Sequence, residues 1–219
     1  MAPINFLVDG ARTDAPTLVF AHGAGMPMDA PYMNTVAQGL AQAGLRVVRF
    51  EFAYMAQRRT GGSKRPPPKM PLLQEEYHAA LSALARDVGA DGPIVIGGKS
   101  MGGRVASLIA DDLHAARHIR GVLCLGYPFH PQGKPDVLRV DHLEALLTPT
   151  LMCQGTRDPF GTEADVATYP LSPQIEMAWF EDGDHDLKPR KRVTGLDHAA
   201  HLAQFCEIAG SWVKERCAG

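Results

Sequence analysis

Cysteine is scarce in this 219-residue sequence, and its spacing argues against cysteine-based sites. The four cysteines are Cys124, Cys153, Cys206 and Cys217, and no two of them form a C-x-x-C pair. Zinc knuckles and dithiol redox centres are built on such pairs, so we expect four free thiols. No other pattern in the sequence indicates a metal or an organic cofactor, and we expect neither.

Long apolar runs are missing as well. No stretch approaches the roughly 20 apolar residues that a membrane-spanning helix needs. The opening MAPINFLVDGARTD has neither a basic start nor a long apolar run, which argues against a signal peptide. Hydrophobic residues make up 45% and charged residues 21% of the chain, as in ordinary globular proteins. The sequence therefore predicts one domain over residues 1–219, in the cytoplasm and without a membrane partner.

Short β-type runs alternate with helical patterns along the chain. The predicted strands are Thr17–Ala21, Arg46–Phe52, Pro93–Gly97, Gly121–Gly126, Thr150–Gly155 and Ile175–Phe180, with Ile4–Val8 as an antiparallel edge strand. The predicted helices span residues 31–43, 73–89, 101–116, 137–147 and 198–216. Most of the strands are continuous apolar runs, which is typical of parallel strands covered on both faces. This alternation predicts the α/β class, with a mostly parallel sheet flanked by helices.

One segment fits neither pattern. Residues Ala56–Pro71 are rich in glycine and proline, which argue against a helix or a central strand. We predict a long exposed loop here, and long loops in compact domains are often functional. Because this loop is the only sizeable insertion in a short chain, we expect no large cap domain.

The strongest chemical signal is the pentapeptide Gly98-Lys99-Ser100-Met101-Gly102. It follows a predicted strand and precedes a predicted helix, the context in which G-x-S-x-G forms a nucleophile elbow. The tight turn of such an elbow exposes the serine hydroxyl above the sheet. A phosphate-binding loop would need glycine at Pro93 instead, so we predict Ser100 as a nucleophile.

A serine nucleophile needs a base, and the base needs a carboxylate to orient it. In this kind of fold the acid and then the base follow the serine, in loops after later strands. Asp158 follows the strand TLMCQ and His185 follows the strand IEMAWF. We therefore predict a Ser100–His185–Asp158 triad, with Asp184 and Asp186 as alternative acids.

Backbone N–H groups are expected to hold the oxyanion of such a site. One belongs to Met101, which directly follows the nucleophile. The second is predicted in the loop His22-Gly23-Ala24-Gly25, where Ala24 is the preferred donor and Gly25 the alternative. In the same loop, His22 is a candidate substrate contact.

Four motifs carry a family resemblance: AHGAG, GGKSMGGR, QGTRDPFG and GDHDLKPRK. In this order and spacing they resemble the small α/β hydrolases of the dienelactone-hydrolase-like group. They are most similar to the family that contains testis-expressed protein 30 and the third subunit of the non-specific-lethal complex. The resemblance runs from about residue 17 to the last helix and implies an α/β-hydrolase fold with these triad positions. Dienelactone hydrolases use cysteine at the elbow, so Ser100 favours a serine esterase mechanism instead.

Acidic residues are missing from two segments, one between Glu51 and Glu75 and one between Asp186 and Asp197. The basic residues of these segments are Arg58, Arg59, Lys64, Arg65, Lys69, Lys188, Arg190, Lys191 and Arg192. Both segments should emerge near the triad, where positive charge would attract an anionic substrate. Candidate substrate contacts are Arg58, Arg59, Lys188 and Arg190. The alternative is that both segments are solvated loops whose charge only aids solubility.

These features predict a serine hydrolase that cleaves an ester, thioester or lactone bond in a small-molecule substrate. The alternative is a non-catalytic interaction module on the same fold, because fold does not dictate function. A net charge of −2 and few interleaved aromatic residues argue against nucleic-acid binding. The sequence does not indicate an oligomeric state.

Overall fold

A computed structural model describes residues 4–218. The strands are β1 (Phe6–Asp9), β2 (Thr17–Ala21), β3 (Arg46–Phe50), β4 (Ile94–Lys99), β5 (Val122–Leu125), β6 (Thr150–Gly155) and β7 (Ile175–Phe180). The longer helices are α1 (Pro31–Gln42), α3 (Met70–Asp87), α4 (Met101–Leu108), α5 (Ala110–Ala115) and α9 (His198–Cys217). Short helical turns are α2 (Ala53–Ala56), the 3₁₀ turn η1 (Gln57–Thr60), α6 (Asp141–Glu144), α7 (Glu163–Val166) and α8 (Lys191–Thr194).

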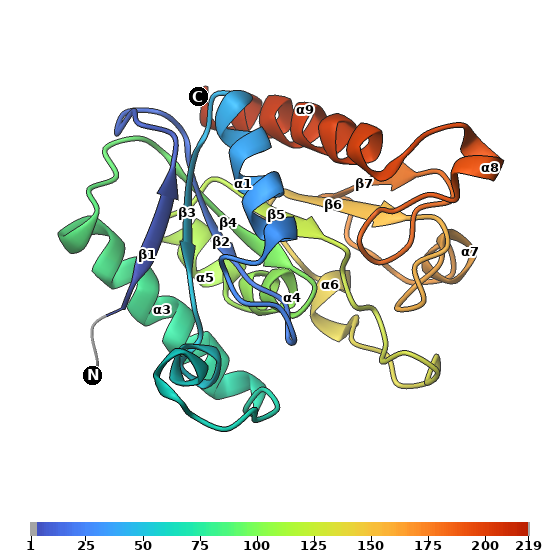
Figure 1. Ribbon diagram of the computed structural model, residues 1–219, viewed down its shortest axis with the longest axis horizontal. Helices are drawn as coiled ribbons and strands as arrows, with labels where there is room; N and C mark the ends of the chain where they lie inside the picture. Colours follow the sequence, from blue (N-terminus) through green and yellow to red (C-terminus); the bar gives the residue numbers. More distant parts are fainter. Residues whose placement is uncertain (1–3, 219) are drawn as a thin grey trace.

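The strands form one sheet in the order β1-β3-β2-β4-β5-β6-β7 (Figure 1). β1 pairs antiparallel with β3, and every other neighbouring pair is parallel. The mostly parallel sheet and the antiparallel edge strand predicted from the sequence are thus confirmed, although β1 starts at Phe6 rather than Ile4. Because the strands from β2 to β7 run parallel, the loops that follow them meet at one edge of the sheet.

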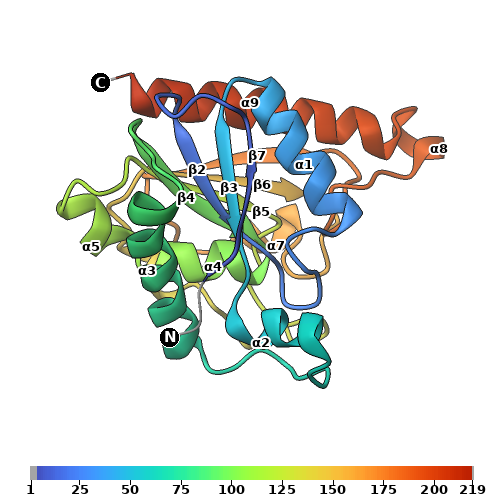
Figure 2. The same cartoon turned by 60° about the vertical axis from the view of Figure 1, so that its left-hand side comes forward.

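Helices cover both faces of the sheet (Figures 1 and 2). Side chains alternate between the faces along each strand, so Val19 and Ala21 of β2 enter one core cluster while Leu18 and Phe20 enter the other. The first cluster includes apolar side chains of α3 and α4, and the second includes those of α1 and α9. This burial on both faces accounts for the continuous apolar runs of the central strands.

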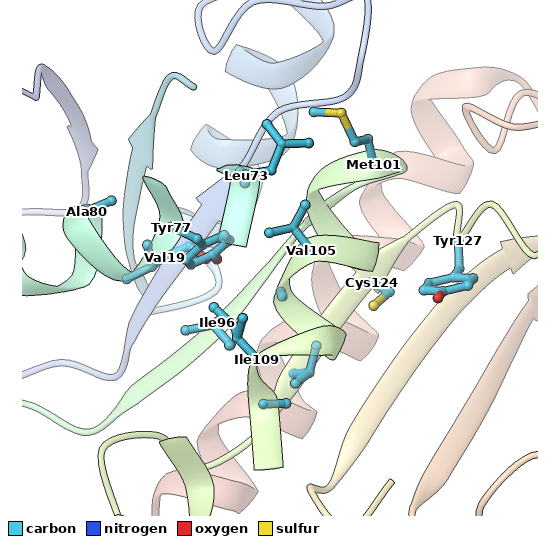
Figure 3. Packing of buried hydrophobic residues seen from close by; sticks show 14 of the residues in the cluster. Val19, Leu73, Tyr77, Ala80, Ile96, Met101, Val105, Ile109, Cys124 and Tyr127 are labelled. Carbon is cyan, nitrogen blue, oxygen red and sulfur yellow. The ribbon is translucent and has the colours of Figure 1, made fainter. Parts of the chain in front are cut away.

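Helix α4, which follows Ser100, packs tightly against the sheet. Figure 3 shows Val105 and Ile109 beside Tyr77 of α3 and Ile96 of β4, and all four side chains are buried. Fully burying an aliphatic side chain of this size contributes about 1.5–3 kcal/mol. The packing gives the turn at Ser100 a rigid support.

Three predicted segments differ from the structure. The predicted helix 101–116 is interrupted at Ile109, and the predicted helix 137–147 shrinks to α6. Beyond the end of α6, the Asp111 carboxylate accepts hydrogen bonds from the backbone N–H groups of Leu147 and Thr148. The predicted loop Ala56–Pro71 begins with η1, whose residues include neither glycine nor proline.

The segments between strands in residues 4–218 are loops, short helical turns and at most two longer helices, and they form no separate cap domain. In the same range, no helix combines the length and the apolar character needed to cross a membrane.

Candidate active site

Ser100 lies in a sharp turn between β4 and α4, and its backbone is strained. Its φ angle of 52° is in the left-handed region, which residues other than glycine rarely adopt. The flanking glycines permit the turn, since a methyl group on Gly98 or Gly102 would lie 2.6 or 2.5 Å from the carbonyl oxygen of Ala21. The G-x-S-x-G pattern therefore reflects the close approach of α4 to β2.

Ser100, His185 and Asp158 form one hydrogen-bonded chain. The Oγ atom of Ser100 lies 2.9 Å from Nε2 of His185, and Nδ1 of His185 lies 2.8 Å from Oδ2 of Asp158. A carboxylate only accepts, so Nδ1 carries the proton and Nε2 is left to accept from the hydroxyl. The alternative acids face elsewhere: Asp184 accepts backbone N–H groups of its own loop, and Asp186 pairs with Lys99.

Asp158 is fully buried and firmly oriented. Its Oδ1 accepts from the backbone N–H of Phe160, and its Oδ2 accepts from Nε2 of Gln154 at 2.9 Å. Gln154 is itself tied to the backbone of Tyr127 through both ends of its amide. The Phe160 ring covers His185, with the ring centroids 4.3 Å apart. Gln154 and Phe160 are supporting residues that our sequence analysis missed.

Side chains from distant elements hold the loop that carries His185. Each backbone carbonyl from residue 185 to residue 188 accepts at least one side-chain hydrogen bond. The donors are Lys99 to His185, Tyr32 and His198 to Asp186, His201 to Leu187, and Arg157 to Lys188. Leu187 is fully buried and has a φ angle of 62°, so the loop turns sharply just after His185.

The predicted oxyanion loop lies beside Ser100. A methyl group on Gly23 would lie 3.7 Å from Cβ of Ser100, and the exposed Ala24 follows directly. In the described part of the chain, the backbone N–H groups of Ala24 and Met101 donate to no backbone carbonyl. Both therefore remain available to a ligand. The Tyr54 hydroxyl donates to the Ala24 carbonyl at 2.9 Å and lies 4.0 Å from Sδ of Met101, so it links the two segments.

His22 has a different position from the one predicted. It is fully buried, and its Nδ1 donates to the carbonyl of Gly23 at 2.7 Å while its Nε2 accepts from the backbone N–H of Phe52. Burial lowers the pKa of His22, which keeps the ring neutral as this pair of bonds requires. The prediction of a substrate contact is wrong here, because the buried ring binds the backbone of the predicted oxyanion loop and of Phe52.

The two basic segments are less positive than their sequences suggest. Arg59 forms ion pairs with Asp29 and Glu51, and Arg190 forms one with Asp182. Arg190 also lowers the pKa of the Asp182 carboxyl to about 2. Arg59 and Arg190, two of the predicted substrate contacts, are thus paired with acids that lie outside the acid-free segments.

Arg58 and Lys188 differ from these two arginines. Among the described residues neither has a carboxylate partner within ion-pair distance. Arg58 lies over the Tyr54 ring, with its guanidinium carbon 5.7 Å from the ring centroid, and Lys188 is exposed.

A groove of about 560 Å³ lies between α1 and α9, away from the triad. None of the predicted site residues lines it. Within residues 4–218, no cluster of three or more histidine, cysteine or acidic side chains is arranged to hold a metal ion.

Comparison with known proteins agrees with this architecture. Residues 14–214 match the family described as alpha/beta hydrolase domain. Est1E from Butyrivibrio proteoclasticus, solved with ferulic acid, superposes with a TM-score of 0.71 at 16% identity, over 99% of this chain and 96% of that one. A dienelactone hydrolase from Anabaena variabilis gives 0.69 at 20% identity, over 97% and 91% of the two chains.

A third similar structure is an α/β serine hydrolase without a lid from Xanthomonas campestris. Its TM-score is 0.66 at 18% identity, over 98% of this chain and 89% of that one. At these identities the likeness concerns the fold, and it confirms the predicted α/β-hydrolase fold. With the family match extending over most of its length, the chain belongs to the alpha/beta hydrolase domain family.

Proposed function

We propose that this protein is a serine hydrolase that cleaves an ester-like bond, with Ser100 as nucleophile, His185 as base and Asp158 as the acid that orients it. The observation that carries the proposal is the continuous hydrogen-bonded chain from Ser100 to Asp158, which starts at a strained serine. A neutral imidazole with its acceptor nitrogen on a serine hydroxyl is arranged for general-base catalysis.

The proposed reaction has two halves. His185 takes the proton of Ser100 as the hydroxyl oxygen bonds to the substrate carbonyl carbon, and the N–H groups of Ala24 and Met101 hold the oxyanion. The leaving group departs with the proton from His185, which leaves an acyl-enzyme. Water then attacks the acyl carbon while His185 takes its proton, and the acid is released as that proton returns to Ser100. No step needs a metal or an organic cofactor.

The substrate class is proposed as a small molecule with a carboxylic ester, thioester or lactone bond. Similar structures include a protein solved with ferulic acid and one named a dienelactone hydrolase. Kinship with the testis-expressed protein 30 family, proposed on the shared motifs, does not narrow the bond type. The cytoplasmic location also stays a proposal, which cell fractionation tests.

An anionic substrate remains a proposal, and fewer basic residues support it than the sequence suggested. Arg58 and Lys188 are now the cations that carry it, since Arg59 and Arg190 are paired. The test is kcat/KM for a matched anionic and neutral ester across a salt series. Electrostatic attraction predicts a preference for the anion that fades with salt and with Arg58→Gln plus Lys188→Gln. An unchanged preference in the double variant would contradict it.

The decisive experiment combines a fluorophosphonate probe with a panel of p-nitrophenyl esters, thioesters and lactones. We expect the probe to label Ser100, and Ser100→Ala and His185→Ala each to lower kcat by roughly 10⁴-fold or more. The double variant should lose little further activity, since the residues act as a unit. No labelling and no turnover would favour the alternative, a non-catalytic interaction module on the same fold.

A further inference from the structure

Lys99, the residue before the proposed nucleophile, is a buried lysine. Only 2% of its side chain is exposed, although lysine is almost never fully buried unless it is paired. It is the last residue of β4, and its side chain reaches towards the loop after β7 rather than towards solvent. A side chain that served only to fill this space would not need a charged group.

The ammonium group of Lys99 contacts the two residues at the centre of that loop. Its Nζ donates to the backbone carbonyl of His185 at 2.8 Å and lies 3.3 Å from Oδ1 of Asp186. Burial lowers the pKa of Lys99, while the charges of Asp186 and Asp158 oppose that change and favour the protonated form. The side chain is thus both a hydrogen-bond donor and a charge beside the proposed base.

Gly126 shows how close this charge lies to the imidazole. A methyl group at Gly126 would lie 2.9 Å from Nζ of Lys99, 2.6 Å from the carbonyl oxygen of His185 and 3.2 Å from its Nδ1. The ammonium group and the imidazole therefore border the same small space. Gly126 has a φ angle of 65°, so the turn after β5 also depends on glycine at this point.

We propose that Lys99 is a positioning residue that holds the His185 loop through the His185 carbonyl and whose positive charge disfavours protonation of the imidazole. The proposal rests on the proposed hydrolase function. A neutral imidazole is the form that can accept the Ser100 proton, so a nearby cation extends activity towards lower pH. The other charged groups around the base are Asp158 at its Nδ1, Asp186 and Asp184 in its own loop, and Arg157, which pairs with Asp184.

The test compares pH profiles of kcat/KM for a neutral p-nitrophenyl ester. In Lys99→Met the side chain keeps its length and loses its charge, so we expect the midpoint of the acidic limb to rise by about one pH unit. The variant should recover part of its lost activity at alkaline pH.

Two further variants check the sign and the location of the effect. Asp186→Asn removes the opposite charge at a half-exposed position and should lower the midpoint pH of the acidic limb. Lys214→Met, on the exposed side of α9, is the matched control and should leave the limb unchanged.

A second readout is independent of turnover. In ¹⁵N-histidine-labelled Ser100→Ala protein, the NMR titration midpoint of the His185 ring should rise when Lys99→Met is added. Equal midpoints with and without Lys99→Met would overturn the role of the charge, and full activity of Lys99→Met at all pH values would overturn the positioning role. Failure of the wild-type protein to hydrolyse any ester would refute the proposed function, while the NMR titration would still decide the role of Lys99.

Discussion

Ser100 lies in a turn that backbone packing holds, whereas His185 lies on a loop that side chains hold. At the elbow, the glycines let α4 approach β2 closely, and the backbone N–H of Ser100 donates to the carbonyl of Leu125 at 2.9 Å. In the His185 loop, donors from β4, α1, α9 and the loop after β6 bind four successive carbonyls.

This difference explains which substitutions each half of the site tolerates. A backbone-packed turn allows almost no change at its glycines, because neighbouring backbone cannot move away. A loop held by several side chains shares its support, so the loss of one donor should weaken the site without abolishing it.

Gly102→Ala should have the largest effect. The added methyl would lie 2.5 Å from the Ala21 carbonyl oxygen and 2.8 Å from that of His22, so α4 must shift away from β2. We expect a loss of roughly 1–3 kcal/mol of unfolding free energy and of about 10³-fold in kcat/KM, measured by thermal melting and ester hydrolysis. Gly133→Ala, where nothing lies within 4 Å of the added methyl but φ is 71°, shows the effect of backbone strain without crowding: it should cost about 1–2 kcal/mol of stability and keep full activity.

Gly126→Ala should lower activity more than stability. Its methyl would crowd the His185 carbonyl and the Lys99 ammonium rather than a strand, so the base would be displaced while the sheet is kept, and alanine at a φ angle of 65° adds backbone strain of about 1–2 kcal/mol. A displacement of about 1 Å can cost roughly 10²-fold in rate. The measurements are kcat/KM and the melting temperature of the same samples. A loss of stability without a loss of kcat/KM would contradict the displacement of the base.

His201→Phe should have a moderate effect. An aromatic ring is kept, although a larger one, but Leu187 loses the one side-chain donor that its carbonyl has among the described residues, at a buried position, which costs about 1–3 kcal/mol. We expect roughly a tenfold loss in kcat. His198→Phe is the matched control, because the Asp186 carbonyl keeps its bond from Tyr32. Equal losses of kcat in the two variants would contradict the idea that each carbonyl needs its own donor.

His142→Gln should leave activity unchanged and alter only the response of stability to acid. His142 is hydrogen-bonded to Ser107 of α4, and burial together with the charge of Arg104 lowers its pKa to about 4. The unfolded chain therefore binds a proton between about pH 6.5 and pH 4 that the folded chain does not, so folding stability falls as the pH drops through this range. Melting temperatures at pH 7 and pH 4.5 should diverge less in the variant than in the wild type.

The elbow could be predicted from the sequence because its geometry depends on glycines at fixed spacing. The strands could be predicted because both faces of the sheet are covered, which leaves apolar runs. The triad residues were found by their positions after β4, β6 and β7. In contrast, nothing local in the sequence predicts that Arg59 of η1 pairs with Asp29 and Glu51, or that Asp111 accepts from Leu147 and Thr148 just beyond α6, since these are tertiary contacts.

The supporting residues of the base could not be assigned from the sequence. Lys99 and Gln154 are polar residues at the end of one apolar strand and within another. This pattern indicates buried polar side chains but does not name their partners. Tyr32, His198 and His201 lie on helices α1 and α9, and only the fold brings them to the same loop. His22 was assigned to the site wrongly, because it is close to the predicted oxyanion loop in the sequence. The sequence does not reveal that both of its ring nitrogens are hydrogen-bonded to the backbone.

The dependence of the His185 loop on α1 and α9 also has a consequence for how the chain folds. The central strands β2, β4 and β5 precede α9 in the chain and can pair without it, whereas α9 must dock on α1 before His198 and His201 reach their acceptors. Contacts between such distant parts of a chain form slowly. We therefore expect refolding to regain helical and sheet structure first, and the competence to react with an active-site probe only in a later kinetic phase.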